Sequence, residues 1–396
     1  MSPPLNYDFF APPRITFGWG RRRELGTIAK ALGRRAFLVC GSKTLEAGGA
    51  LDELCASLAG AGVAAESLGT ISREPEVADV DQFTKRLLEC QPTADDFVLA
   101  VGGGSAVDLG KAVAAMATNR DAETVQDFLE GVGRGLSITR LPLTFLAMPT
   151  TAGTGSEATK NAVISNQTPP FKKSLRSDAM VPRAVIIDPE LSVSVNPRTT
   201  AYTGMDAITQ LIESYISCRA KPLPRALALQ GLRLAIGSIE EAVAHGSSRP
   251  AREAMAHAAL LSGMALANAG LGMAHGVAAA LGVLCHVPHG LACAVMLPAT
   301  LRANREAALV ELAELARGTL DRRLVSGIDD SSAADAFIAH IESICRNVGI
   351  PRTLGEIGVE PRHLPDLVRG SRGNSMSGNP REIADAELSA ILERML

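Results

Sequence analysis

Residues 96–117 read DFVLAVGGGSAVDLGKAVAAMA, and this stretch decides the class of fold. An apolar run ends in Gly102, Gly103 and Gly104, and a helical pattern begins at Ser105. This order predicts a buried strand at residues 96–101, a tight turn and a helix that extends to about residue 117. A helix N-terminus offers unpaired N–H donors, and glycines let a ligand approach the backbone closely. The turn is therefore either a cradle for a diphosphate or a glycine turn that caps an ordinary helix.

The turn differs from two common phosphate-binding motifs. Val107 stands where the dinucleotide fingerprint has its third glycine. A P-loop is excluded because Ala112 replaces its Ser or Thr. Asp108 follows Ser105 at the spacing of a capping box, which predicts that Ser105 is the N-cap of the helix.

Strand and helix patterns alternate around this turn. Further strands are predicted at residues 36–40, 63–68, 143–148 and 184–187, and further helices at residues 50–61 and 77–90. Such alternation is typical of a parallel sheet with helices on both of its faces.

From about residue 200 onward the strand patterns stop. Helices are predicted at residues 201–218, 225–245, 252–269, 275–284, 306–318 and 333–348. Pro182, Pro189 and Pro197 mark the transition. We therefore place an α/β nucleotide-binding domain at residues 1–195 and an all-α domain at residues 196–396, with the site expected between them.

Composition and charge exclude several classes of partner. The 396 residues carry 39 Lys and Arg against 42 Asp and Glu, and this near-neutral balance gives no electrostatic footprint for nucleic acid. Residues 254–301 contain no Asp, Glu, Lys or Arg, but Gly, Pro, Asn and His interrupt them too often for a membrane span. The seven cysteines form no CxxC pair, and the N-terminus lacks the features of a signal peptide. We expect a cytoplasmic protein with no nucleic-acid or membrane partner.

A second run of small polar residues, 149–157 (PTTAGTGSE), follows the strand predicted at 143–148. Hydroxyl and backbone N–H groups at the carboxyl end of a strand suit a phosphate or a nicotinamide carboxamide. The alternative is a plain Ser/Thr/Gly loop. Two donor-rich turns in one α/β domain favour a dinucleotide.

A third feature is a set of metal-ligand residue types. Asp206 and Gln210 are four residues apart on a predicted helix, so both project from one face. His275 and His289 flank the turn between two apolar helices. Carboxylate and imidazole together suit Fe²⁺ or Zn²⁺. The alternative is a set of hydrogen-bonded core residues, because distance along the chain does not establish approach in space.

Taken together, these motifs resemble the iron-containing (group III) alcohol dehydrogenases, a family related to dehydroquinate synthase. Matching blocks follow the family's order at residues 13–18, 101–111, 149–159, 188–191, 204–213, 272–297 and 379–381. The resemblance implies a dehydroquinate synthase-like fold, in which an α/β dinucleotide-binding domain precedes an all-α metal and substrate domain. It also implies a homodimer, and we expect residues 14–17 at its interface.

The resemblance assigns the cofactor contacts mainly to the two donor-rich turns. The implied contacts are Gly102, Gly103, Gly104, Ser105, Asp108, Thr150, Thr151, Thr154, Asn161 and Lys172. Many family members bind NAD through an acidic residue in a region that here reads Gly41-Ser42-Lys43. Because Ser42 cannot repel a 2′-phosphate and Lys43 lies beside it, the sequence favours NADP.

The implied metal ligands depart from the family's pattern of one Asp and three His. Asp206, His275 and His289 match three of these positions. Gln210 replaces the remaining histidine, and Ala279 replaces a further histidine that is common in the family. An amide oxygen is a weaker ligand than imidazole for Fe²⁺ or Zn²⁺, so we predict weakened metal binding.

The expected function is hydride transfer between NAD(P) and a small alcohol or aldehyde. In a metal-free alternative, Gln210, His275 and His289 hydrogen-bond the carbonyl of an activated oxo-acid or phosphonoaldehyde, as in a maleylacetate reductase. The GTGSE and VPHG blocks argue against a dehydroquinate synthase-like cyclase or a polyol-phosphate dehydrogenase. A non-catalytic nucleotide-binding relative is a third reading, against which the intact cofactor blocks argue.

Overall fold

The computed structural model describes residues 6–41 and 48–396. These residues form two compact units: Ala11–Val193, and Ser194–Leu396 together with the N-terminal segment that ends at Phe10. Two hydrogen bonds hold this segment in the second unit. The N–H of Phe10 donates to Oδ1 of Asn268 over 2.7 Å, and the carbonyl of Phe10 accepts from Nδ2 of Asn268 over 2.8 Å.

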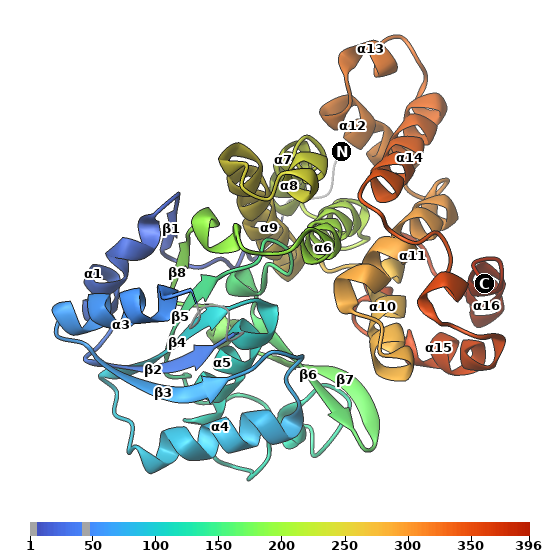
Figure 1. The fold of residues 1–396 in the computed structure, drawn as a ribbon. Helices are drawn as coiled ribbons and strands as arrows, with labels where there is room; N and C mark the ends of the chain where they lie inside the picture. The colour runs from blue at the N-terminus through green and yellow to red at the C-terminus, as the bar shows by residue number, and fades with distance from the viewer. Residues whose placement is uncertain (1–5, 42–47) are drawn as a thin grey trace. The chain divides into compact units, whose positions relative to one another are not determined.

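The first unit is built on a six-stranded parallel sheet with the order β1-β8-β5-β4-β2-β3 (Figure 1). The strands are β1 (Ile15–Phe17), β2 (Arg35–Cys40), β3 (Ala64–Thr70), β4 (Asp96–Gly102), β5 (Thr144–Pro149) and β8 (Ala184–Ile187). Every strand predicted from an apolar run is confirmed. β1 lies at one edge of the sheet, where it pairs with β8.

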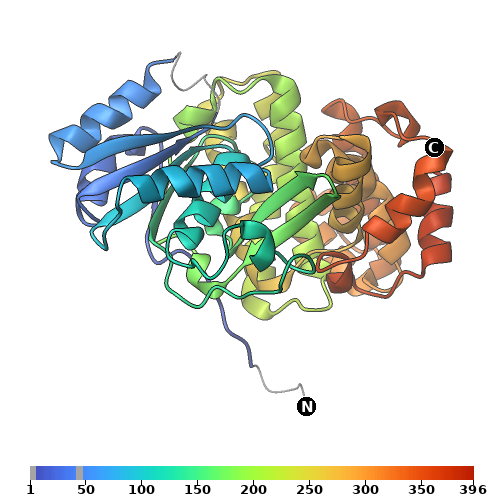
Figure 2. The same ribbon diagram turned by 90° about the horizontal axis from the view of Figure 1, so that it is seen from below.

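Helices cover both faces of this sheet (Figures 1 and 2). Residues of α1 (Leu25–Lys30) and α3 (Ala50–Gly60) belong to one apolar cluster, and residues of α4 (Val77–Glu89) and α5 (Gly104–Met116) belong to another. Alternate residues of β4 enter the two clusters, because successive side chains of a strand point to opposite faces. A strand that is buried on both faces reads as a continuous apolar run.

An antiparallel hairpin of β6 (Asn161–Gln167) and β7 (Pro170–Arg176) was not predicted. Only Ala162 and Ile164 of β6 are buried, and polar residues follow them. This alternation is too short to distinguish a strand from a loop in sequence.

The second unit contains no strand in residues 194–396, so the expected α/β half followed by an all-α half is confirmed. Its helices are α6 (Pro197–Ile216), α7 (Pro222–Ile236), α8 (Ile239–Ala244), α9 (Arg249–Ala269), α10 (Met273–Cys285), α11 (His289–Asn304), α12 (Leu309–Thr319), α13 (Arg322–Val325), α14 (Asp330–Asn347), α15 (Leu364–Gly370) and α16 (Asp385–Glu393). The single helix predicted at residues 225–245 is wrong. The chain forms α7 and α8 instead, because Gly237 and Ser238 between them are weak helix formers.

Within the described part of the chain, no single helix has the length and apolar character that a membrane span needs. In these described residues, α9 and α10 together have the required length and apolar character, but they are bent by 101° at the break between them.

Candidate functional site

The two donor-rich turns of the first unit lie against each other. β4 and β5 are adjacent and parallel, with Gly102 opposite Pro149, so both strands end at the same edge of the sheet. The N–H of Thr150 donates to the carbonyl of Gly102 over 3.0 Å. A Cβ atom added to Gly104 would lie 2.6 Å from Cγ2 of Thr154, which leaves no room for a side chain there. The structure therefore brings the glycine turn and the threonine loop together.

The predicted cap of α5 is wrong. The helix begins at Gly104, and its N-cap is Gly103 rather than Ser105. No side chain therefore caps the helix. Asp108 is buried inside the unit, where Oδ2 accepts the N–H of Val163 over 3.0 Å and Oδ1 lies 3.3 Å from Nζ of Lys111. Tertiary contacts thus use the carboxylate that a capping box would need.

The predicted cofactor residues outside the two turns do not share one environment. The side-chain oxygen of Asn161 is buried and has no hydrogen-bond partner among the described residues. Lys172 on β7 forms an ion pair with Glu74, with 2.6 Å between Nζ and Oε1. Ser42 and Lys43, on which the NADP preference depends, lie outside the described residues.

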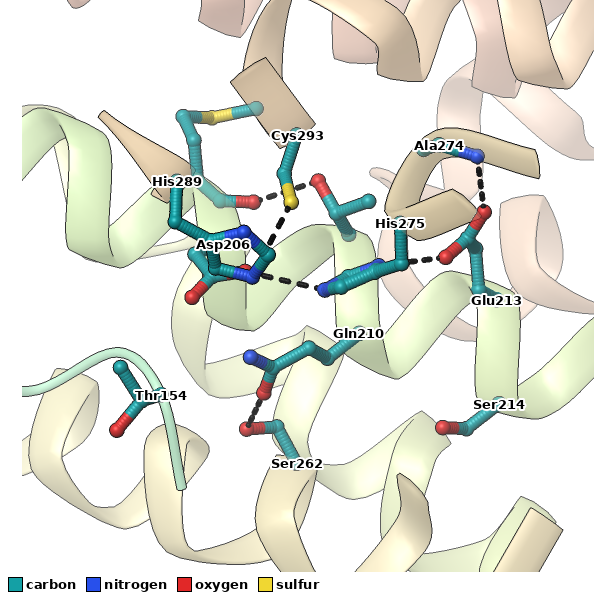
Figure 3. Close-up of polar contacts among 12 residues, drawn as sticks. Thr154, Asp206, Gln210, Glu213, Ser214, Ser262, Ala274, His275, His289 and Cys293 are labelled. Carbon is teal, nitrogen blue, oxygen red and sulfur yellow. Dashed lines mark hydrogen bonds and ion pairs between the residues drawn. The ribbon is translucent and has the colours of Figure 1, made fainter. Parts of the chain in front are cut away.

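In the second unit, side chains from three helices meet at one point (Figure 3). Asp206 comes from the middle of α6, His275 from the first turn of α10, and His289 is the first residue of α11. Oδ1 of Asp206 lies 3.2 Å from Nε2 of His275 and 4.0 Å from Nε2 of His289. Cys293, also on α11, has its Sγ 3.8 Å from Nε2 of His289. One ligand atom from each of these four residues lies within 4.8 Å of the others.

The structure adds Cys293 to the predicted set and gives Gln210 a different partner. Oε1 of Gln210 accepts a hydrogen bond from the hydroxyl of Ser262 on α9 over 2.7 Å (Figure 3). Sequence reasoning missed Cys293, although a signal was present. His289 and Cys293 are four residues apart on one helix, the spacing that places two side chains on one face.

A glycine lets α11 approach α6 closely enough to form this cluster. A Cβ atom added to Gly290 would lie 2.4 Å from the carbonyl oxygen of Tyr202 and 3.5 Å from Cβ of Asp206. Any larger residue at position 290 would separate the two helices. The glycine of the VPHG block therefore brings His289 beside Asp206.

A carboxylate behind the cluster fixes the first turn of α10. Oε2 of Glu213 lies 2.6 Å from Nδ1 of His275, and Oε1 accepts the N–H of Ala274 over 2.7 Å. Asn379 supports the same turn by accepting the N–H of Met273 over 3.2 Å. A hydrogen bond at Nδ1 directs the lone pair of Nε2 toward the cluster, as the outer partner of a metal-ligating histidine does.

The electrostatics of the cluster favour a positive charge at its centre. Burial opposes ionisation of Asp206, but the charges of His289 and His275 hold its pKa below the ordinary value. Burial also opposes a positive charge on His275, yet its neighbours Cys293 and Asp206 raise its pKa well above the ordinary value. Burial raises the pKa of the Cys293 thiol to about 12. Either a protonated imidazole or a metal ion satisfies this arrangement.

The donor set fits a transition metal. One carboxylate oxygen, two imidazole nitrogens and a thiol sulfur are ligand types that Zn²⁺ and Fe²⁺ accept, whereas Mg²⁺ and Ca²⁺ prefer oxygen. His275 is fixed from behind by Glu213, and Asp206 is almost fully buried.

Sequence comparisons agree with the resemblance over almost the whole length of the chain. The iron-containing alcohol dehydrogenase family matches residues 12–189, and the C-terminal family of Fe-containing alcohol dehydrogenases matches residues 200–396. Long-chain-alcohol dehydrogenase 1 of Geobacillus thermodenitrificans strain NG80-2 is 33% identical over 385 residues, which cover 96% of this chain and 95% of that protein.

Solved structures share the fold. The crystal structure of a 1,3-propanediol oxidoreductase has 32% identity and a TM-score of 0.92, and the match covers 99% of this chain and 100% of that one. Sulfoacetaldehyde reductase from Bifidobacterium kashiwanohense in complex with NAD⁺ has 30% identity and a TM-score of 0.86, with 99% of each chain covered. The chain therefore belongs to the iron-containing alcohol dehydrogenase family, and it is an oxidoreductase of that type.

Proposed function

We propose that this protein is an NAD(P)-dependent alcohol dehydrogenase, which also reduces the corresponding aldehyde. Bound NAD(P) would exchange a hydride between C4 of its nicotinamide and the carbinol carbon of a small alcohol, and the alcohol hydroxyl would release its proton on oxidation and regain one on reduction. The observation that carries the proposal is the meeting of Asp206, His275 and His289 from three helices, within the 4.8 Å that also includes Cys293. The two donor-rich turns of the first unit support it.

The first unit binds the cofactor in this proposal. The N–H groups of the first turn of α5 have no intrahelical acceptors, so they donate to the diphosphate together with the positive end of the helix dipole. The hydroxyls of Thr150, Thr151 and Thr154 supply further donors beside the turn. The buried side-chain oxygen of Asn161 has no partner among the described residues, and it gains one when it accepts a hydrogen bond from the cofactor.

The second unit binds and activates the substrate. Asp206, His275 and His289 would hold a divalent cation, and this cation would supply Lewis acidity to the substrate oxygen. Glu213 keeps Nδ1 of His275 protonated, so that Nε2 presents a lone pair. The side chain of His289 is 29% exposed, whereas that of Asp206 is 2% exposed, so a small molecule reaches the cluster from the side of His289.

The direct test is a reductase screen of purified protein with small aldehydes and oxo-acids. Each substrate is supplied with NADH or NADPH, and with Fe²⁺, Zn²⁺ or a chelator. The proposal expects reduced nicotinamide to be consumed only when a carbonyl substrate is present, and His275→Ala to abolish the reaction. Consumption of neither nicotinamide with any substrate, together with no shift in melting temperature on adding either, contradicts it.

A second candidate function is metal-independent reduction of an activated carbonyl, such as an oxo-acid or a phosphonoaldehyde. The observation that favours it is the position of His275, which lies between the carboxylates of Asp206 and Glu213 and has a raised pKa. A protonated imidazole there stabilises negative charge on the substrate oxygen, and the amide of Gln210 adds a donor. This version expects full activity in the presence of a chelator.

We also propose two finer properties. The chain prefers NADP, because Ser42 and Lys43 leave the adenosine ribose without a carboxylate that repels a 2′-phosphate. The ratio of kcat/KM for the two cofactors in Ser42→Asp tests this preference, and an unchanged ratio contradicts it. The protein also forms a homodimer, with residues 14–17 at the interface, which sedimentation of a variant in β1 tests.

A further inference from the structure

Four side chains, rather than the three matched from sequence, point toward the centre of the cluster. In a tetrahedral zinc site, ligand atoms are separated by about 3.4 Å between N and O and by about 3.6 Å between N and S. Here the separations are 3.2 Å from Asp206 to His275, 4.0 Å from Asp206 to His289, and 3.8 Å from His289 to the sulfur of Cys293. These three separations are close to the edges of one coordination tetrahedron, and one ligand atom from each of the four residues lies within 4.8 Å of the others.

Gln210 is directed elsewhere, although its sequence position matches a histidine of the family. An amide ligates a metal through its oxygen, and that oxygen accepts the hydrogen bond from Ser262 over 2.7 Å. The side chain of Gln210 reaches toward α9, whereas the thiol of Cys293 points at the ring of His289 (Figure 3).

Local structure explains why Cys293 is in reach. It lies one helical turn after His289 on α11, so both side chains project from the same face. The contact of Gly290 with Tyr202 presses that face against α6, where Asp206 lies. Cys293 is fully buried, and burial excludes water from the sulfur.

We propose that Cys293 is the fourth protein ligand of the metal site, in place of Gln210, and that the site takes Zn²⁺ or a similar borderline-soft divalent cation. This inference rests on the metal-dependent form of the proposed function. A thiolate is a softer ligand than the imidazole of the family histidine that Gln210 replaces. The set of Asp206, His275, His289 and Cys293 therefore favours Zn²⁺. Binding of the substrate oxygen would then make the cation five-coordinate, which Zn²⁺ accepts, and the exposed side chain of His289 marks the side from which the substrate would arrive.

The test uses the full-length protein freed of metal with a chelator and titrated with Co²⁺ alone. A cobalt–thiolate bond gives a charge-transfer band in the near ultraviolet, which carboxylate, imidazole and amide ligands do not give. We expect this band in the parent protein and in Gln210→Ala, and we expect its loss in Cys293→Ser. The affinity for Zn²⁺ falls at least about tenfold in Cys293→Ser and less than about twofold in Gln210→Ala.

Cys345→Ser is the matched control, because Cys345 is another buried thiol and belongs to α14 rather than to the cluster. It should keep the band, which separates loss of a ligand from the general cost of replacing a buried cysteine. Absence of the band in the cobalt-loaded parent, or its retention in Cys293→Ser, overturns the inference.

The band is measured without nucleotide or substrate, so it is independent of dehydrogenase activity. A shift in melting temperature with NADH or NADPH tests the proposed function separately. If the band is present and neither nucleotide shifts the melting temperature, the ligand set stands and the proposed function fails. If the nucleotide shifts the melting temperature and the band is absent, the inference about Cys293 fails alone.

Discussion

Replacing Gly103 with alanine separates a diphosphate cradle from a plain glycine turn. Gly103 has φ −71° and ψ −175°, a conformation that alanine adopts freely. Among the described residues, the added Cβ atom would meet only the side chain of Thr151, at 3.3 Å from Oγ1 and 3.4 Å from Cγ2. Alanine is a poorer N-cap than glycine, but it also reduces the entropy of the unfolded chain, so these two effects partly cancel. The free energy of unfolding should change by less than about 1 kcal/mol.

A bound diphosphate has less freedom to move away from the added methyl group than the side chain of Thr151 has. A methyl group at position 103 is added at the N-cap of α5, beside the N–H groups to which the diphosphate is proposed to bind. We expect the Kd for NADH and NADPH to rise at least about tenfold, which corresponds to about 1.4 kcal/mol. Nucleotide titration measured by fluorescence, with urea unfolding of the same samples, tests both parts. Unchanged affinity in a folded Gly103→Ala protein would refute the cradle.

Gly102→Ala is the contrasting control. Its Cβ atom would lie 2.7 Å from Cα of Gly41 and 2.7 Å from Cβ of Ala106, much closer than the usual 3.5 Å or more between carbon atoms. Backbone atoms cannot rotate away as the side chain of Thr151 can. We expect this variant to lose about 1–3 kcal/mol of stability whether or not nucleotide is present.

Three further predictions follow from other contacts. Gly290→Ala places a Cβ atom 2.4 Å from the carbonyl oxygen of Tyr202. Urea unfolding should show a loss of about 1–3 kcal/mol in the free energy of unfolding, and metal titration should show a lower affinity. Parent-like stability and affinity would contradict the proposed role of the close contact between α11 and α6. Glu213→Gln removes the charged partner of His275, so it should weaken Zn²⁺ binding about 10–100-fold without changing nucleotide binding. A zinc affinity equal to that of the parent would contradict the proposed role of Glu213. Burial raises the pKa of Glu157 from 4.5 to about 7, so the free energy of unfolding falls as pH rises from about 4.5 to about 7. Glu157→Gln should therefore be more stable than the parent by about 3 kcal/mol at about pH 8 and equally stable at about pH 4. A constant difference in the free energy of unfolding between the two proteins across this pH range would refute this.

The sequence predicted those parts of the fold in which local and tertiary preferences agree. β4 and β5 are long apolar runs because both faces of the sheet are buried, so their positions were readable. The hairpin of β6 and β7 was not, because only Ala162 and Ile164 of β6 are buried and most of its other residues are polar. Ser105 has the local spacing of a cap, but Asp108 is taken by contacts with Val163 and Lys111 that no local pattern records.

The candidate site was predictable by residue type and only partly by arrangement. The residue types and spacing of Asp206, His275 and His289 indicate a metal site, and the structure brings these residues together. Sequence reasoning did not indicate Cys293 or the partner of Gln210, because the direction of each side chain depends on packing between α6, α9 and α11. Helical spacing placed Gln210 on the same face as Asp206, but it could not show that Ser262 takes the amide oxygen.

Hydride transfer is the central claim, and isotope transfer measures it most directly. The protein is supplied with an aldehyde and with NADH or NADPH that carries deuterium at C4 of the nicotinamide ring, and the product alcohol is analysed by mass spectrometry. We predict that deuterium appears on the carbinol carbon of the product and that none is transferred by His275→Ala. An alcohol formed without the label from either stereochemical form of the cofactor, or no alcohol with any aldehyde, would contradict the account.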